Sequence, residues 1–103
     1  MFESPRQFFE EAERRIDPAR TVGKRMSYRF DIQGAGSWRL DVDDGKVIVA
    51  QSTAPADCVI EASEETFLTI VSGEQSALGA YMRGRVRVRG DVGLAARLRE
   101  LLR

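Results

Sequence analysis

The sequence predicts an α+β fold: a five-stranded, mainly antiparallel sheet with helices packed on one face, in the order α-β-β-β-β-α-α-β-α. Residues 26–50 alternate apolar and polar side chains, the period of strands with one buried face. Residues 56–103 combine two further alternating stretches with apolar residues at helical spacing. Three sequential strands, a crossover, and two strands separated by helices place the helices on one face of one sheet.

The first helix is expected over about residues 5–16. Ser4 is followed by a proline at the first helical position and by a glutamine three residues on, as in a capping box. Asp17 and the proline after it end the helix. Its apolar edge carries Phe8 and Phe9, which we expect to pack on the sheet. The alternative is that these two side chains form a lid over a ligand cavity.

Three strands are expected between residues 26 and 50. A turn at Gly34–Gly36 separates the first two strands. Asp44 and Gly45 predict a hairpin after the second, because this pair readily adopts the positive backbone angles of a primed turn. The residues expected on the buried face are Met26, Tyr28, Phe30, Ile32, Trp38, Leu40 and Val42.

The second half begins with a strand at residues 56–62 and a helix that Ser63 caps, with two glutamates in its first turn. Gly73 is the expected end of this helix, and a short second helix ends at Gly84. A strand at residues 85–89 then leads into a last helix. Asp91 caps that helix, whose apolar stripe is Leu94, Ala95, Leu98, Leu101 and Leu102.

One long series of residues resembles a known family. A-D-C-V-I-E-A-S leads into F-L-T-I-V-S-G, and R-G-R-V-R-V-R-G-D precedes V-G-L-A-A-R-L-R-E-L-L. Upstream, F-D-I-x-G and W-x-L-D stand in the first two strands. Over about residues 26–103 the chain resembles the sterol carrier protein type 2 family of lipid-binding domains. The resemblance implies a five-stranded sheet covered by helices, with a hydrophobic cavity between them that takes a long-chain lipid.

That cavity would take a fatty acid, an acyl chain, an isoprenoid or a sterol-like molecule. The inward-facing positions expected to line it are Phe30, Trp38, Leu40, Phe67, Ile70, Leu78, Tyr81, Met82, Leu94, Leu98 and Leu101. Each would equally suit a filled core. An empty cavity of about 300 Å³ would cost on the order of 7 kcal/mol, against a total stability of about 5–15 kcal/mol. The protein is therefore expected either to carry a ligand or to close the cavity.

Composition narrows the class of protein. The 103 residues make about one domain, and 16 basic residues balance 16 acidic ones, which argues against a general nucleic-acid or membrane-surface binder. No apolar run approaches the about 18 residues of a membrane span, and no signal peptide opens the chain. We expect a cytoplasmic protein that consists of a single lipid-binding domain over residues 1–103.

The sequence predicts no catalytic residue, metal site or cofactor. The chain contains no histidine, which removes Ser-His and Cys-His pairs and the commonest metal ligand. The single cysteine, Cys58, lies on the apolar side of its strand. We expect it to be a small buried hydrophobe; the alternative is a reactive thiol. We therefore do not expect an enzyme.

An arginine-rich segment is the one unusual electrostatic feature. The arginines that share a parity, and so one face of the sheet, are Arg83, Arg85, Arg87 and Arg89. Like charges this close repel, so we expect acidic neighbours such as Asp57 or Glu61 to pair with them. The alternative is a patch for anionic lipid headgroups or for a partner protein. Nucleic acid is not expected, because no aromatic residues interleave with the arginines.

Two functions remain open from the sequence. One is a lipid carrier, with Tyr81 and Met82 near the mouth of the cavity and the C-terminal helix as its movable cover. The other is a non-catalytic scaffold that keeps the fold without the lipid. Such a scaffold would act as a homodimer or as an accessory to an enzyme partner.

Overall fold

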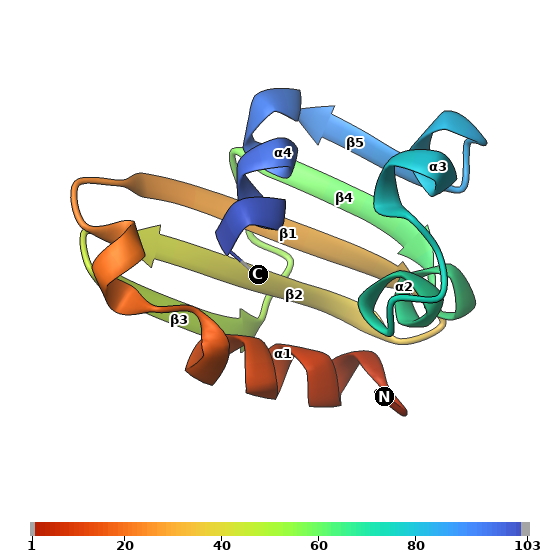
Figure 1. Ribbon diagram of the computed structural model, residues 1–103, viewed down its shortest axis with the longest axis horizontal. Helices are drawn as coiled ribbons and strands as arrows, with labels where there is room; N and C mark the ends of the chain where they lie inside the picture. The colour runs from red at the N-terminus through yellow and green to blue at the C-terminus, as the bar shows by residue number, and fades with distance from the viewer. Residues whose placement is uncertain (1, 102–103) are drawn as a thin grey trace.

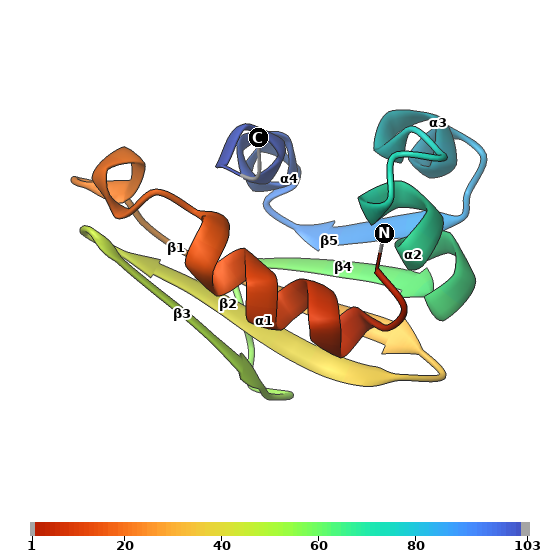
Figure 2. The same ribbon diagram turned by 60° about the horizontal axis from the view of Figure 1, so that its bottom comes forward.

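Five strands form one sheet in the order β3-β2-β1-β4-β5, and the helices lie on one of its faces (Figures 1 and 2). The computed structural model describes residues 2–101, so Leu102 lies outside the described residues. β1 and β4 are parallel, and the other neighbouring strands are antiparallel. The predicted fold class and element order are confirmed. The elements are α1 (Pro5–Arg15), the 3₁₀ helix η1 (Pro18–Thr21), β1 (Arg25–Gln33), β2 (Gly36–Asp43), β3 (Lys46–Gln51), β4 (Cys58–Ser63), α2 (Glu64–Val71), α3 (Ala77–Met82), β5 (Val86–Gly90) and α4 (Val92–Leu101).

Side-chain caps begin the helices where the sequence predicts them. Ser4, Ser63 and Asp91 each accept a hydrogen bond from a main-chain N–H two or three residues downstream, at 3.2, 3.1 and 3.0 Å. These N–H groups have no partner within the helix, so the caps satisfy them. The predicted end of the first helix is also confirmed within one residue. Asp17 then caps η1, because its carboxylate accepts the N–H of Ala19 at 2.9 Å. This 3₁₀ helix was not predicted from the sequence.

The hairpin between β2 and β3 has the predicted primed turn. Asp44 and Gly45 both have positive φ, at 42° and 89°. The carboxylate of Asp44 also accepts the N–H of Gly23 at 2.7 Å. The same turn therefore holds the segment that leads from η1 into β1.

The helices divide the covered face between them. α1 runs along β2 and β3, whereas α3 and α4 stand over the two ends of β5 (Figures 1 and 2). On β1 and β2, the apolar side chains that face the helices are all buried, as the alternation predicts. Among residues 2–101, no helix lies on the other face of the sheet (Figure 2), and charged side chains from β1, β2, β4 and β5 lie on it.

Candidate functional site

An aromatic cluster fills the space between α1, α2 and the sheet. The ring of Phe9 stacks on Trp38 and on Phe67, with centroids 5.0 and 5.4 Å apart. Phe8 meets Phe67 edge-on at 5.3 Å, and Phe30 completes the cluster. Phe8 and Phe9 are both buried, which confirms that the first helix packs on the sheet.

The expected cavity residues fall into three groups by burial. Ile70 is half-buried. Leu78, Tyr81 and Met82 are exposed. The buried members of the set are Phe30, Trp38, Leu40, Phe67, Leu94, Leu98 and Leu101. The buried residues belong to one core cluster, as both a filled core and a cavity wall require. Their contact with a ligand stays a prediction.

The expected inward orientation of the α3 residues is wrong. Leu78, Tyr81 and Met82 keep 57%, 44% and 77% of their surface exposed, whereas Ala80 is fully buried. The helix has only six residues and can bury one face. It packs through small Ala80, whose size lets the helix backbone approach its neighbours closely, and this turns the three large apolar side chains outward.

The strands under α3 and α4 also leave apolar surface incompletely covered. Val86 and Val88 of β5 and Ile60 of β4 face the helices and pack against the core, yet they are only partly buried. Ile60 is the cross-strand neighbour of Val88. Partly covered apolar surface therefore continues across β4 and β5 in the half of the sheet that carries the exposed apolar residues of α3.

The four arginines of the arginine segment have different surroundings. Arg89 pairs with Glu61 on β4, which confirms one of the two expected partners, and its guanidinium lies 3.9 Å from Asp31. Asp57 is not a partner: it precedes β4 and exchanges hydrogen bonds with Ser27, accepting its N–H at 3.0 Å and donating its own N–H to the hydroxyl at 2.9 Å.

Arg83 is also placed differently from the expectation. It caps the C-terminal end of α3 instead of lying on β5, and its guanidinium donates to the side-chain oxygen of Gln75 at 2.8 Å. The reason is that α3 continues to Met82 and β5 begins only at Val86, which leaves Arg87 and Arg89 on one side of β5 and Arg85 in the bend before it. Of these, Arg85 and Arg87 line a polar pocket of about 570 Å³.

Asp31 lies at the centre of the charge network on the uncovered face. Arg29 donates two hydrogen bonds of 3.0 Å to its carboxylate, and the hydroxyl of Ser37 donates one of 2.8 Å. Burial opposes ionisation, but these hydrogen bonds and the charges of Arg29 and Arg89 outweigh it, so the pKa of Asp31 lies below its ordinary value.

Polar side chains that the sequence analysis did not single out form the walls of the pocket. Thr66 and Thr69 come from α2, and Gln75 comes from the loop after it. Gln33 and Glu61 belong both to this pocket and to a second one of about 290 Å³ beside it. The outward parity of β1 and β4 predicts the side on which these two residues lie. The alternation of the strands does not predict that Thr66 and Thr69 of α2 line the same pocket.

Cys58 is fully buried, as expected of a small apolar residue. Burial, together with the charges of Asp91 and Asp57, raises the pKa of its thiol. Since the thiolate is the nucleophile, this environment disfavours reaction at neutral pH. Within residues 2–101, no three side chains of the metal-binding types gather in one place.

Comparisons of the sequence identify a family. A model of the SCP-2 sterol transfer family matches residues 7–103. The hydroxysteroid dehydrogenase-like protein 2 of Xenopus laevis is 29% identical over 98 residues, which cover 91% of this chain and 24% of that protein. The chain therefore spans about a quarter or less of the first curated relatives it matches.

Solved structures share the fold. The stereoselective inverting sec-alkylsulfatase from Pseudomonas sp. matches with a TM-score of 0.83 and 22% identity, over 96% of this chain and 16% of that one. Palmitated SCP2L2 from Aedes aegypti matches with a TM-score of 0.75 and 24% identity, over 96% and 94% of the two chains. In the part of the chain that the structure describes, no helix has the length and apolar character needed to cross a membrane.

Proposed function

Because this chain belongs to the SCP-2 sterol transfer family, we propose that it binds a long-chain apolar ligand between its sheet and its helices. The ligand is a fatty acid, an acyl chain, an isoprenoid or a sterol-like molecule. The proposal takes residues 1–103 as one lipid-binding domain. It assigns no catalytic step and no cofactor.

The observation that carries the proposal is the incomplete burial of apolar side chains around α3 and β5. Leu78, Tyr81 and Met82 are exposed, and Val86 and Val88 are only partly covered. Removing apolar surface from water contributes about 25 cal/mol per Å². Binding of a ligand chain that covered these side chains would therefore be favourable, and the ligand would not first have to displace a packed core.

The aromatic cluster limits where such a ligand fits. Phe9, Trp38 and Phe67 already occupy the space beneath α1 at stacking distance, so an acyl chain there would have to displace them. The proposal therefore places the ligand on the β4–β5 side. Tyr81 and Met82 lie at its mouth, and α4 is its movable cover.

Native mass spectrometry of the freshly purified protein, with a solvent extract run in parallel, tests the proposal first. We expect an excess mass of a few hundred daltons and a lipid of that mass in the extract. Delipidation should then lower the melting temperature. An apo mass that is unchanged after incubation with palmitate and with cholesterol would contradict the proposal.

A pair of variants tests the location. Leu78→Gln removes an exposed apolar residue at the proposed mouth, and Ile48→Gln removes one of similar exposure, 57% against 55%, on β3. If the bound ligand buries Leu78, loss of this aliphatic side chain should weaken binding by about 1.5–3 kcal/mol. Affinity for a fluorescent fatty acid should fall at least about 10-fold in the first variant and stay unchanged in the second. Equal losses would contradict the site.

The scaffold function is the second candidate, and one observation favours it. The curated relatives are much larger proteins, so in them the matching region is one part of a longer chain. Exposed Leu78, Tyr81 and Met82 would then contact an enzyme partner or a second copy. Multi-angle light scattering that finds a dimer, together with the absence of bound lipid, would favour this function; a monomer that binds lipid favours the carrier.

A further inference from the structure

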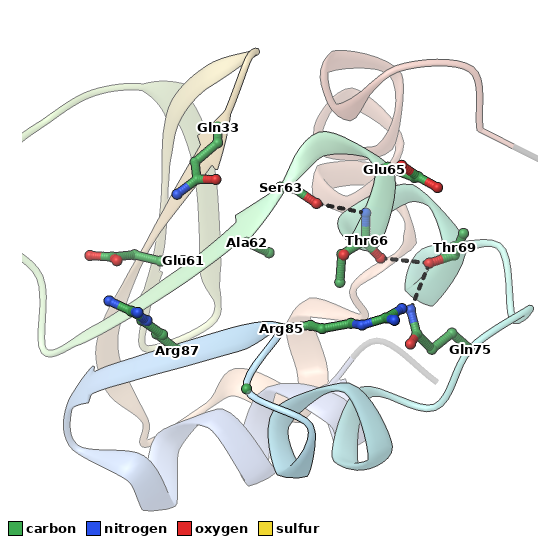
Figure 3. Close-up of a pocket in the computed structure, with 11 residues that line it drawn as sticks. Gln33, Glu61, Ala62, Ser63, Glu65, Thr66, Thr69, Gln75, Arg85 and Arg87 are labelled. Atoms are coloured by element: carbon green, nitrogen blue, oxygen red, sulfur yellow. Dashed lines mark hydrogen bonds between the residues drawn. The ribbon is translucent and has the colours of Figure 1, made fainter.

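We propose that Arg85 and Arg87 form a binding site for an organic anion that carries a phosphate or carboxylate group. The site is the polar pocket of about 570 Å³ between β4, β5 and α2 (Figure 3). This volume is in the range of small-molecule sites. The inference is independent of the proposed lipid binding, because the two arginines alternate along the chain with Val86 and Val88, which pack against the core.

The charges around the pocket leave these two arginines available. Among residues 2–101, neither Arg85 nor Arg87 has a carboxylate oxygen within 4.0 Å. Glu61 stands across from Arg87 in the sheet register, but Arg89 forms the ion pair with it. Glu65 is the other acidic residue of the lining. Since Arg89 compensates Glu61, Glu65 is the one remaining acidic residue of the lining to balance Arg85 and Arg87.

The wall opposite the arginines is held by its own hydrogen bonds. The hydroxyl of Thr69 donates to the main-chain oxygen of Thr66 at 2.8 Å and accepts from the side-chain amide of Gln75 at 2.9 Å (Figure 3). Arg83 donates to the other end of the same amide. The N–H of Arg85 donates to the main-chain oxygen of Ala80 at 2.9 Å, which fixes the backbone where this arginine enters the pocket.

The two arginines enter the pocket in different directions. Arg87 lies on β5 and its side chain extends toward Glu61, whereas Arg85 lies in the bend before β5 and its side chain extends toward Gln75 (Figure 3). Each guanidinium presents a fork of N–H donors that matches the paired oxygens of a carboxylate or phosphate group. Arg85 and Arg87 can therefore contact one ligand in the pocket from two sides. The hydroxyl and amide wall meets the rest of the ligand.

A titration of the full chain followed by amide NMR tests the site, with glycerol 3-phosphate and citrate as soluble probes. Vesicles of phosphatidylcholine with phosphatidic acid test whether the anion is instead a lipid headgroup. The variants are Arg85→Gln, Arg87→Gln and the double substitution. Arg14→Gln on α1 is the matched control, an exposed arginine outside the pocket.

We expect shifts of the amides of Arg85, Arg87 and Thr66, and a loss of affinity of at least 10-fold in the double variant with no loss in Arg14→Gln. Binding of the soluble probes assigns a free anion, whereas arginine-dependent binding of the vesicles alone assigns a headgroup. If neither kind of probe binds, or if all variants lose affinity equally, the proposal is overturned. The fatty-acid titration is a separate measurement, so failure of one site leaves the other open to its own result.

Discussion

The hydroxyl of Tyr28, in the middle of β1, donates a hydrogen bond of 2.7 Å to the main-chain oxygen of Leu94 in α4. Both residues are buried, and 66 positions of sequence separate them. Burial, with the nearby negative groups, raises the pKa of Tyr28 well above its ordinary value, so the phenol keeps its proton. This bond joins the last helix to the centre of the sheet.

Tyr28→Phe should therefore destabilise the fold by about 0.5–1.5 kcal/mol, the usual net contribution of one hydrogen bond. For a domain of this size that lowers the melting temperature by about 4–8 °C per kcal/mol. Tyr81→Phe is the matched control, because Tyr81 is 44% exposed. Thermal unfolding followed by circular dichroism measures both variants. Equal melting temperatures for the two would contradict a structural role for the bond.

Gly90 should tolerate substitution less well than Gly73, although both have a φ of 83°. A Cβ at Gly73 meets no atom within 4 Å, whereas one at Gly90 would overlap the main-chain oxygen of Asp57. Gly73→Ala should cost about 1–2 kcal/mol for the left-handed backbone alone. Gly90→Ala should cost about 2 kcal/mol more because of the overlap. Urea unfolding compares them, and equal losses would mean that the strand simply moves aside.

The network around Asp31 predicts an acid-sensitive part of the stability. Because its folded pKa is lowered, its ionised form stabilises the fold above the unfolded pKa of about 3.9, and this contribution is lost as the pH falls through the folded value. Asp31→Asn should therefore be less stable at pH 7 by about 1–2 kcal/mol. The difference should shrink below about pH 4. Urea unfolding at several pH values measures it; a constant difference at every pH would argue against ionisation as its origin.

Cys58 should react slowly in the native protein. The thiol is fully buried and its pKa is raised, so modification requires the fold to open. If opening costs about 5 kcal/mol, the reaction with a thiol reagent should be about 10³- to 10⁴-fold slower than in denaturant. The rate is measured from the absorbance of the thiolate that the reagent releases when it reacts with Cys58. A native rate close to the denatured one would restore the reactive-thiol alternative.

Features that depend on near neighbours in the chain could be predicted from the sequence. Ser63 and Asp91 begin helices because a short polar side chain satisfies N–H groups only two or three residues away. Asp44 and Gly45 form the primed turn because these residue types tolerate positive φ. The alternation from Met26 to Ile32 settles which side of β1 is buried, since the period of a strand is a local property.

Features that depend on residues far apart in the chain could not be predicted in this way and become visible in the folded protein. The periodicity of α3 is compatible with burial of either face, and contact through Ala80 turned Leu78 and Met82 outward. The alternation of the strand predicts that Arg87 and Arg89 lie on the same face. In the folded sheet, Arg89 forms the ion pair with Glu61, and Arg87 lines the pocket. Spacing along the chain specifies directions, whereas packing selects among the partners that those directions bring within reach.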